Sequence, residues 1–447
     1  MRYIGCQVVL LIAAVAWAAP AGAERPPFDY FQNSWSVIGL KDYNFGTRIT
    51  PDNELLLAGK RKVRFRIGPD LKPLSRAQVK VCANGWYPMI LLSTTEGGVA
   101  YQFEFWATPL PSVPDWKAAF DGPVAGLRHD GAATAAQAGE DFLNWVVVGM
   151  TTLGRGVYPA KVWMEIIDGD KVDGQTREWA LETVRAEILC DVYRIPFEAS
   201  YDEARFSDED WQVWRNRTRE YWEQRVRGTT RIIVPDEKAT DALLAAHVTQ
   251  LIASDHGEVH GGEGFYDEFY IRDGAYQVME LEEAGMMDVA RVAVGKYLEH
   301  QLPDGRFESQ KGQFDANGQA VWVLWQFYKI TGDAAWLAEV YPKMRRAVDW
   351  TMKARRQAPA DSPFAGVLPN AVADGEYLWD GKHHIVGYDF WNLRGMLCTA
   401  DAAKALDRRD EAGELMKEAD AYRAAIDAAW KRTDVPYFPP SWEKAGT

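Results

Sequence analysis

The sequence predicts two regions of different fold class, an antiparallel β-domain followed by an all-helical half. From about residue 30 to about 200, segments such as 62–67, 99–106 and 144–149 alternate apolar and polar residues with the period of two that half-buried strands show. From Asp236 onward, the apolar residues recur with the 3.6-residue period of helices. We therefore expect a multidomain β + α protein.

The helical half is expected to consist of hairpins. Gly285 ends one predicted helix, and Thr331-Gly332-Asp333 forms a turn in which the glycine ends a helix and the aspartate can cap the next. Repeated helix–turn–helix units build an α-solenoid or an α/α-toroid. The predicted helices cover 237–253, 272–285, 287–301, 316–331, 334–356, 389–406 and 410–431, and a further helix at 208–227 connects the two halves.

The first 23 residues have the layout of a cleaved export signal. Arg2 precedes the apolar stretch Val8–Ala19, and Ala21-Gly22-Ala23 provides the small residues of a cleavage site. No later stretch approaches eighteen uninterrupted apolar residues, so no membrane span is expected after cleavage. The mature protein is expected to be periplasmic or secreted. The predicted organisation is a signal peptide at 1–23, a β-domain at 24–200, a connector at 201–235 and the helical domain at 236–447.

Composition narrows the function classes. A formal net charge of −14 argues against nucleic acid or anionic lipid as a partner. Nineteen Trp, 19 Tyr and 18 Phe suit either large cores or surfaces that stack on sugar rings. Without any Cys-x-x-Cys, neither a zinc ribbon nor a redox site is expected, and no cofactor is predicted. Cys82 and Cys190 could either pair in an oxidising compartment or remain as small buried thiols.

Histidines near the middle of the chain suggest a metal pair at first sight. His256 and His260 lie four residues apart with Glu258 between them, but the four nearby glycines predict a loop, in which the helical i, i+4 geometry is lost. Adjacent His383 and His384 cannot both easily face one ion. We therefore predict no metal site, and we expect residues 255–266 to be a loop that lines a cleft.

Polar and aromatic clusters precede or begin alternate predicted helices. They are Tyr270-Ile271-Arg272-Asp273, Gln313-Phe314-Asp315 and Tyr388-Asp389-Phe390-Trp391. In stacked hairpins every second helix starts on the same face, so these clusters would converge at one mouth, where helix N-termini add positive potential. The alternative is that Asp273, Asp315 and Asp389 merely cap helices or interact favourably with the helix dipoles. Three clusters together favour a polar binding pocket.

A long loop, 357–387, carries the candidate catalytic acid. Loops of this length are usually functional or disordered. A carboxylic acid beside tryptophan and tyrosine has its pKa raised by desolvation, as a general acid that protonates a glycosidic oxygen requires. Glu376 is the first candidate and Asp380 the second, and in a third interpretation either is a solvated loop carboxylate.

Five motifs in order resemble those of six-hairpin glycosidases, most closely the bacterial glucoamylase-like proteins (glycoside hydrolase family 15-like) that carry an N-terminal β-sandwich. The motifs are Tyr270–Ala275, Gln301–Phe307, Asp315–Ala320, Thr331–Asp333 and Tyr388–Trp391. The resemblance covers about 230 to 440 well and the β-domain only by position and class. It implies an antiparallel β-sandwich followed by an (α/α)6 toroid, and inverting hydrolysis of a glycosidic bond.

The resemblance also implies roles for residues. Arg272 and Asp273 would bind the sugar in the innermost subsite, and Glu376 would be the general acid. The family's Trp-Glu pair is Gly375-Glu376 here, with Trp379 three residues later, which keeps Asp380 as an alternative acid. The full set of expected substrate-binding residues is Tyr270, Arg272, Asp273, Gln313, Asp315, Trp379, Asp389 and Trp391.

The sequence stops at Thr447 after about seven predicted helices, whereas a complete toroid has twelve, and the family's general base lies near the last hairpins. The toroid is therefore expected to be incomplete, in a fragment or a truncated relative. The leading hypothesis is an exported glycoside hydrolase that acts on glucan-type oligo- or polysaccharides in carbohydrate metabolism. The alternatives are a sugar phosphorylase or lyase on the same toroid, or a non-catalytic carbohydrate-binding protein.

Overall fold

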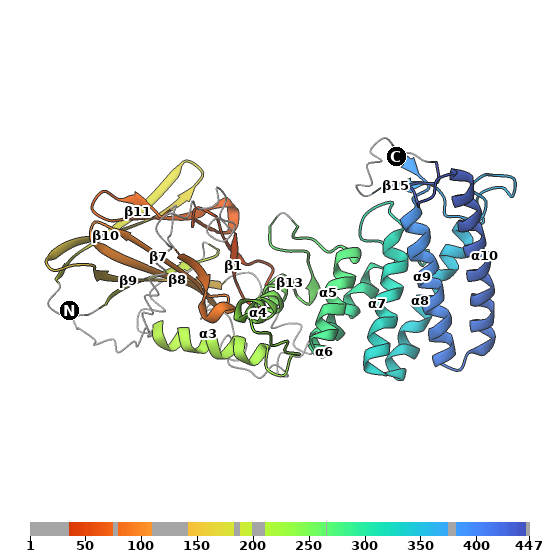
Figure 1. Cartoon of the computed structure of the whole chain (residues 1–447), viewed down its shortest axis with the longest axis horizontal. Helices are drawn as coiled ribbons and strands as arrows, with labels where there is room; N and C mark the ends of the chain where they lie inside the picture. Colours follow the sequence, from red (N-terminus) through yellow and green to blue (C-terminus); the bar gives the residue numbers. More distant parts are fainter. Residues whose placement is uncertain are drawn as a thin grey trace. The chain divides into compact units, whose positions relative to one another are not determined.

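The computed structural model describes residues 35–74, 79–109, 142–182, 188–198, 211–264, 266–373 and 381–443. The chain divides into two compact units. The first comprises Met1–Arg227 and Ile232–His256, and the second comprises Gly228–Arg231 and Gly257–Thr447. Strands dominate the first and helices the second (Figure 1). The predicted export signal at 1–23 lies outside the described residues.

The first unit contains two antiparallel sheets. One has the order β1-β2-β3-β4-β10-β11, with β5 also paired to β4, and the other has the order β12-β9-β8-β7-β6. The strands of the first sheet are β1 (Ser36–Ile38), β2 (Thr47–Ile49), β3 (Leu55–Leu56), β4 (Lys62–Ile67), β5 (Lys72–Pro73), β10 (Val157–Asp168) and β11 (Lys171–Glu182). Those of the second are β6 (Val79–Cys82), β7 (Ile90–Glu96), β8 (Val99–Pro109), β9 (Phe142–Thr152) and β12 (Leu189–Pro196).

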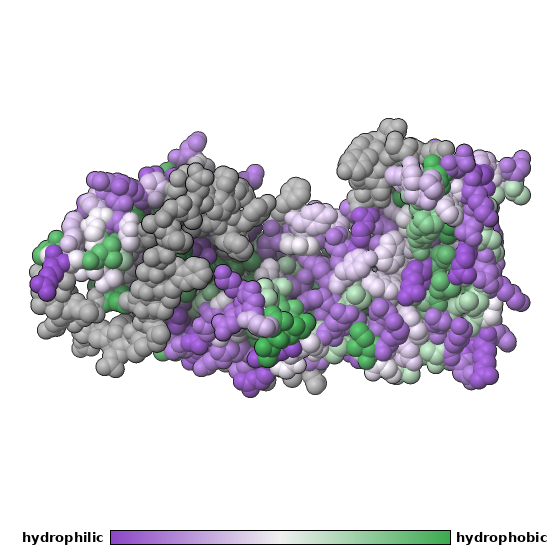
Figure 2. Space-filling model, in the orientation of Figure 1, coloured by the Kyte–Doolittle hydropathy of each residue, from purple (hydrophilic) through white to green (hydrophobic). Residues whose placement is uncertain are grey.

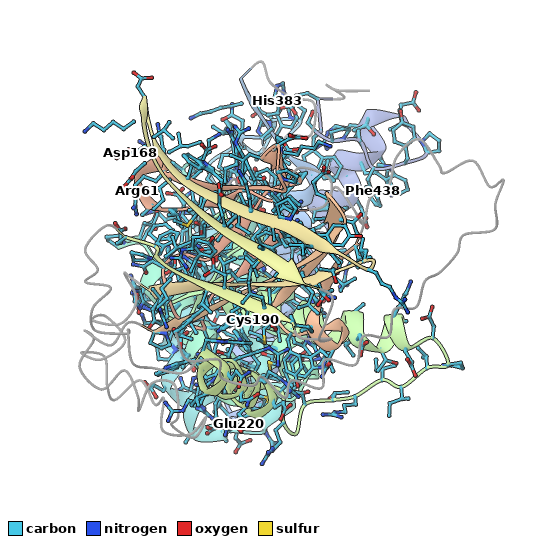
Figure 3. All side chains as sticks on the ribbon, turned by 90° about the vertical axis from the view of Figure 1, so that its left-hand side faces the viewer. Arg61, Asp168, Cys190, Glu220, His383 and Phe438 are labelled. Atoms are coloured by element: carbon cyan, nitrogen blue, oxygen red, sulfur yellow. The ribbon has the colours of Figure 1, made fainter. Side chains whose placement is uncertain are left out.

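Alternation along the strands explains how the sheets pack. In β4 every second side chain is buried, because strand residues point alternately to opposite faces. The buried Phe65 meets Phe103 of β8 and Tyr193 of β12 in the other sheet, with ring centroids 5.4 Å apart in both pairs. The predicted antiparallel β-domain is therefore confirmed, as two sheets packed face to face. Figure 3 looks toward this end of the molecule, with Asp168 at the tip of the β10–β11 hairpin.

Cys82 and Cys190, the cysteines that the structure describes in the first unit, are free and partly buried thiols. Cys82 ends β6 and Cys190 lies in β12, labelled in Figure 3. These strands form opposite edges of the same five-stranded sheet, so the two sulfur atoms cannot meet without unfolding it. Of the two alternatives left by the sequence, the free thiols are what the structure contains.

Among the described residues of the first unit, two α-helices accompany the sheets, α3 (Trp211–Arg225) and α4 (Glu237–Ile252). Arg215 of α3 donates to Glu104 of β8 at 2.8 Å. Ile252 of α4 packs so closely on Gly39 that a Cβ there would lie 2.8 Å from its Cγ2. The structure thus groups α4 with the β-sheets, whereas the sequence predicts the boundary at 235/236. The helical period alone could not show which neighbour α4 packs against.

The second unit contains three helical hairpins. They are α5 (Ile271–Glu283) with α6 (Met287–Tyr297), α7 (Asp315–Thr331) with α8 (Ala334–Arg355), and α9 (Val386–Ala405) with α10 (Arg409–Thr433). Where the structure describes the chain, its shorter elements are the 3-10 turns η1 (Ala58–Lys60), η2 (Ala83–Gly85) and η6 (Leu298–His300). Two short strand pairs are also present, β13 (Ser254–Asp255) with β14 (Glu258–Val259) and β15 (Ala371–Val372) with β16 (Lys382–His383). The predicted helices are confirmed, with ends displaced by a few residues.

The turns between paired helices follow the expected chemistry. Gly285 and Gly332 end α5 and α7 with φ of 80° and 66°, in the left-handed region that glycine tolerates best. The Asp333 carboxylate then caps α8 by accepting a hydrogen bond from the Trp336 N–H at 3.0 Å. These predicted stops are therefore confirmed.

The hairpins form two layers. The first helices α5, α7 and α9 lie side by side, with α7 in contact with both neighbours (Figure 1). Polar contacts join the second helices: Tyr341 of α8 donates to Glu411 of α10 at 2.8 Å, and Arg291 of α6 pairs with Asp333, the cap of α8, at 2.9 Å. The first helices therefore start at a common end, as predicted. Closure into a toroid stays a prediction.

A backbone contact locks α7 to α9. A Cβ at Gly318 would lie 2.0 Å from the carbonyl oxygen of Trp391, and one at Gly395 would lie 3.0 Å from the Gly318 Cα. Beside this contact, the buried Asn317 amide donates to Asn392 at 2.8 Å and to Thr351 of α8 at 3.1 Å. Since buried amides need partners, this network fixes the three helices relative to one another.

The surface of the second unit is polar where α10 faces solvent, as the hydrophilic colouring along that helix shows (Figure 2). In the part of the chain that the structure describes, no helix is both long and apolar enough to cross a membrane.

Candidate functional site

An ion pair joins the starts of α5 and α7. The Nε and Nη2 atoms of Arg272 donate to Oδ2 of Asp315 at 2.8 and 2.6 Å. Asp315 is the first residue of α7 and is buried, whereas the Arg272 side chain is 34% exposed. Charge-assisted hydrogen bonds of this length are strong and directional. Two residues predicted to converge at one mouth are therefore in direct contact.

Tyr270 stands at the same end of α5, as its N-cap residue. Its hydroxyl donates to Glu268 at 3.0 Å, and this hydrogen bond raises the pKa of the tyrosine. The Tyr270 ring lies 5.1 Å from that of Tyr266, which is 46% exposed. Asp273 follows in the first turn of α5, and the first turns of α7 and α9 hold Asp315 and Asp389. None of these three aspartates occupies the N-cap position, so they do not cap the helices. Their place in the first turns is nevertheless favourable to the helix dipole, so that part of the structural alternative stands.

Trp391 belongs to an aromatic cluster that spans three helices. Its ring centroid lies 5.6 Å from that of Trp322 on α7 and 6.4 Å from that of Tyr276 on α5. Tyr276 and Trp322 are 5.5 Å apart. Trp322 is buried, but half of the Tyr276 side chain is exposed, at 51%. We call Tyr276, Trp322 and Trp391 the aromatic cluster.

Asp389 takes a different place from the one predicted. It is fully buried, and its carboxylate accepts hydrogen bonds from Tyr422 of α10 at 2.6 Å, Trp442 at 2.7 Å and the Leu368 N–H at 2.9 Å. Burial raises the pKa of Asp389 to about 6, against the opposing effect of these donors. The carboxylate is enclosed by protein groups, so the structure gives Asp389 the role of fastening α9 to its neighbours rather than of contacting a substrate.

The other predicted residues divide into two groups. Gln313 is buried just before α7, and its backbone N–H donates to the Gln310 carbonyl at 3.2 Å. Glu376, Trp379 and Asp380 lie outside the described residues. The strands that flank this segment, β15 and β16, pair in register through Ala371–His383 and Val372–Lys382.

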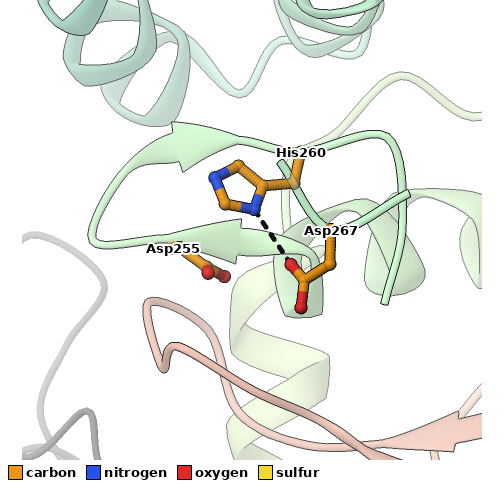
Figure 4. Close-up of side chains that lie close together, drawn as sticks. All are labelled: Asp255, His260 and Asp267. Atoms are coloured by element: carbon orange, nitrogen blue, oxygen red, sulfur yellow. Dashed lines mark hydrogen bonds and ion pairs between the residues drawn. The ribbon is translucent and has the colours of Figure 1, made fainter. Parts of the chain in front are cut away.

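A histidine–carboxylate network beside α5 was not predicted. His260 Nδ1 lies 3.0 Å from an Asp267 oxygen (Figure 4), and its Nε2 lies 3.6 Å from Glu258. The second Glu258 oxygen lies 3.6 Å from Nε2 of His300, whose ring stacks on Phe269. Burial opposes ionisation of Glu258, but hydrogen bonds to the two histidines outweigh it and lower its pKa to about 2.

The expected loop at 255–266 contains part of a short hairpin, since β14 pairs with β13. The network was missed because His300 is 42 residues after Glu258, at the end of a helix, and no spacing links the two. The only hint of this network in the sequence is that Glu258 and His260 lie two residues apart.

This network does not form a metal site within the second unit. Asp267 and Glu258 face opposite nitrogens of the His260 ring, so they cannot share one ion with it. Asp255, also drawn in Figure 4, belongs to the first unit. In the described part of the second unit, no three His, Cys, Asp or Glu side chains bring ligand atoms to one point, as a structural or catalytic metal requires.

A second imidazole–carboxylate pair follows β16. The Nδ1 atom of His384 hydrogen-bonds Glu443, and the His384 N–H donates to both Glu443 oxygens at 3.2 Å. The His384 ring stacks on Phe364 with centroids 3.8 Å apart. Burial raises the pKa of Glu443, but the His384 donors outweigh it, so the net shift is downward and the carboxylate stays ionised. The sequence analysis did not single out Glu443.

No protein-family model matches the sequence, and no curated protein matches it. Among solved structures, the chain is similar to a glycosyl hydrolase of family GH92, ccman5, with 12% sequence identity and a TM-score of 0.26. The similarity covers 74% of this chain and 46% of that one, so this chain spans less than half of that protein's length. A likeness this remote carries no argument about activity.

Proposed function

We propose that this protein is an exported glycoside hydrolase that acts on glucan-type oligo- or polysaccharides. The observation that carries the proposal is the Arg272–Asp315 ion pair at the common end of α5 and α7, on the same helices as the aromatic cluster. Sugars have hydroxyl edges that bind charged groups and apolar ring faces that pack on aromatic side chains. A site that combines the two suits a carbohydrate better than it suits a purely ionic or a purely apolar ligand.

The proposed chemistry is hydrolysis with inversion on an (α/α)6 scaffold, as the resemblance to six-hairpin glycosidases implies. A carboxylic acid protonates the glycosidic oxygen, and a carboxylate base activates a water that attacks the anomeric carbon from the opposite face. The acid and base must lie about 6.5–9.5 Å apart to admit that water. We assign the acid to Glu376, with Asp380 as the alternative, and we assign substrate positioning to Arg272 and Asp273.

The assignment is tested by hydrolysis of maltotriose and cellotriose, followed by NMR of the anomer first released. We expect the wild type to release the inverted anomer. We expect Glu376→Gln to lower kcat by roughly 10²–10⁴, the contribution of a general acid. Asp380→Asn is the matched control and should stay within about threefold of the wild-type rate.

Each contrary outcome has a separate meaning. If the two variants exchange these results, Asp380 is the acid. If product forms only with phosphate present, the protein is a phosphorylase, and an unsaturated product that absorbs in the ultraviolet identifies a lyase. Sugar binding without turnover identifies a non-catalytic carbohydrate-binding protein.

A further inference from the structure

We infer that the aromatic cluster is the floor of one sugar subsite, with the Arg272–Asp315 pair at its rim. The inference rests on the proposed function, in that the ligand is a carbohydrate. It adds Tyr276 and Trp322 to the site, two residues that are not among the substrate-binding residues expected from the sequence.

Helix geometry puts the rim and the floor on the same face. Tyr276 follows Arg272 by four residues on α5, and Trp322 follows Asp315 by seven on α7, and both spacings return to the same side of a helix. The pairs that meet across the two helices are Arg272–Asp315 first and Tyr276–Trp322 next. The ion pair and the rings are therefore successive contacts along one seam, with the rings one to two turns further from the helix starts.

Along this line of contacts, the α7 residues are buried and the α5 residues are partly exposed. Asp315 and Trp322 are buried at 3% and 8%, whereas Arg272 and Tyr276 keep 34% and 51% of their side chains exposed. Asp315 and Trp322 of α7 thus lie beneath Arg272 and Tyr276 of α5 and contact them from the buried side. A ligand would meet the guanidinium and the phenol ring, which Asp315 and Trp322 hold in place.

Gln319 provides an independent indication that this part of α7 can form further hydrogen bonds. It lies between Asp315 and Trp322 on the same side of α7, by steps of four and three residues. The side chain is 1% exposed, and among the described residues neither its amide nitrogen nor its amide oxygen has a hydrogen-bond partner. Buried amides normally have partners, so the seam has polar bonding capacity that its own side chains do not use.

The charge of Arg272 beside the exposed ring of Tyr276 favours a sugar over a protein segment as the ligand. A packed protein segment would bury the Arg272 charge along with Tyr276, and a buried charge is costly even when it is paired. A sugar ring can place an apolar face on Tyr276 and keep its hydroxyls at the Arg272 guanidinium. The site therefore fits an uncharged polyhydroxylated ring.

The test is isothermal titration calorimetry with maltotriose and with cellotriose, on the whole chain. Tyr276→Ala should weaken binding of the preferred trisaccharide about tenfold, in line with loss of one aromatic contact. Tyr276→Phe keeps the ring and should bind within about twofold of wild type. Tyr437→Ala is the matched control, because this tyrosine of the same unit is 52% exposed and its backbone carbonyl, not its ring, accepts from Trp430.

The outcomes separate this inference from the proposed function. If the wild type binds and Tyr276→Ala binds equally well, the floor assignment is wrong while carbohydrate binding stands. If the wild type binds neither trisaccharide, the proposed function fails as well. Equal weakening in Tyr276→Ala and Tyr437→Ala would also overturn the assignment, since it would report a general loss of structure. Near-ultraviolet circular dichroism establishes that each variant is folded.

Discussion

Glu282 on α5 shows what a single buried carboxyl does to this protein. The side chain is 3% exposed, and within the described residues neither oxygen has a hydrogen-bond partner. Burial, with a smaller contribution from the nearby Glu283 charge, raises the pKa of Glu282 to about 8. An uncharged carboxyl is tolerated in such surroundings, whereas a carboxylate is not.

Stability should therefore fall as pH rises through the neutral range. The unfolded chain loses this proton near the ordinary pKa of 4.5, while the folded chain keeps it up to about 8, so stability is lost between these two values. Glu282→Gln removes the titration. Its free energy of unfolding relative to wild type should rise between pH 4 and pH 7, by up to about 3 kcal/mol.

Urea unfolding at the two pH values measures this difference. Glu339→Gln, the same substitution at an exposed position on α8, is the control for the chemistry of the change itself. A difference between Glu282→Gln and wild type that stays constant with pH would show that Glu282 ionises normally in the folded protein.

At the scale of elements, the close contact between α7 and α9 positions Trp391, one ring of the aromatic cluster. Gly318 faces the backbone of α9 at Trp391, the residue that also carries one ring of the cluster. The helices approach so closely only because neither Gly318 nor Gly395 has a side chain. Helical glycine ordinarily costs about 0.5–1 kcal/mol relative to alanine, so the close approach explains its presence here.

Gly318→Ala should destabilise the second unit by at least about 2 kcal/mol, because the new methyl group would overlap the Trp391 carbonyl at 2.0 Å. Gly413→Ala is the matched control, since this helical glycine of α10 has nothing within 4 Å of its Cβ position. That change should leave stability unchanged or raise it by about 0.5–1 kcal/mol. Thermal unfolding followed by circular dichroism compares the two, and equal stabilities would contradict the close approach.

The helical hairpins were predictable because their signals are local. Gly332 and Asp333 end one helix and start the next through their own backbone and side-chain chemistry. Asp389 was not predictable in the same way. Its position in a first turn is shared with Asp315, and what separates a fastening residue from a rim residue is the contact with Tyr422 and Trp442, far along the chain. Tyr276 was missed for the same reason, since one tyrosine in a helix has no pattern.

At the scale of the whole molecule, the sequence predicts the order of the two fold classes correctly but not the division between them. The change from period two to period 3.6 locates the first helix of the series, but α4 packs with the sheets that precede it. Which compact unit a helix belongs to depends on the element that its apolar face packs against. A hydrophobic period shows that a helix has an apolar face, but not which element covers it. The site residues follow the same rule: their positions at helix starts could be read from the sequence, but their partners could not.

Export is the prediction that belongs to the whole chain. Expressed with its own N-terminus in a Gram-negative host, the protein should be recovered from the periplasm or medium with Glu24 as its first residue, as intact-mass measurement would show. Ala23→Arg should block processing, because cleavage needs small residues at this place. A wild-type product that retains residues 1–23 would contradict the export assignment.

The common orientation of α5, α7 and α9 determines where this protein can be engineered. The described parts of the segments that enter these helices, at 257–264, 266–270, 301–314, 356–373 and 381–385, lead to the end where the Arg272–Asp315 pair stands. The short turns at 284–286, 332–333 and 406–408 lie at the other end. Loop grafting at the first end could alter which ligands the protein accepts without disturbing the Asn317–Asn392 network. The opposite end offers attachment points for labels or a surface tether that leave the proposed binding face free.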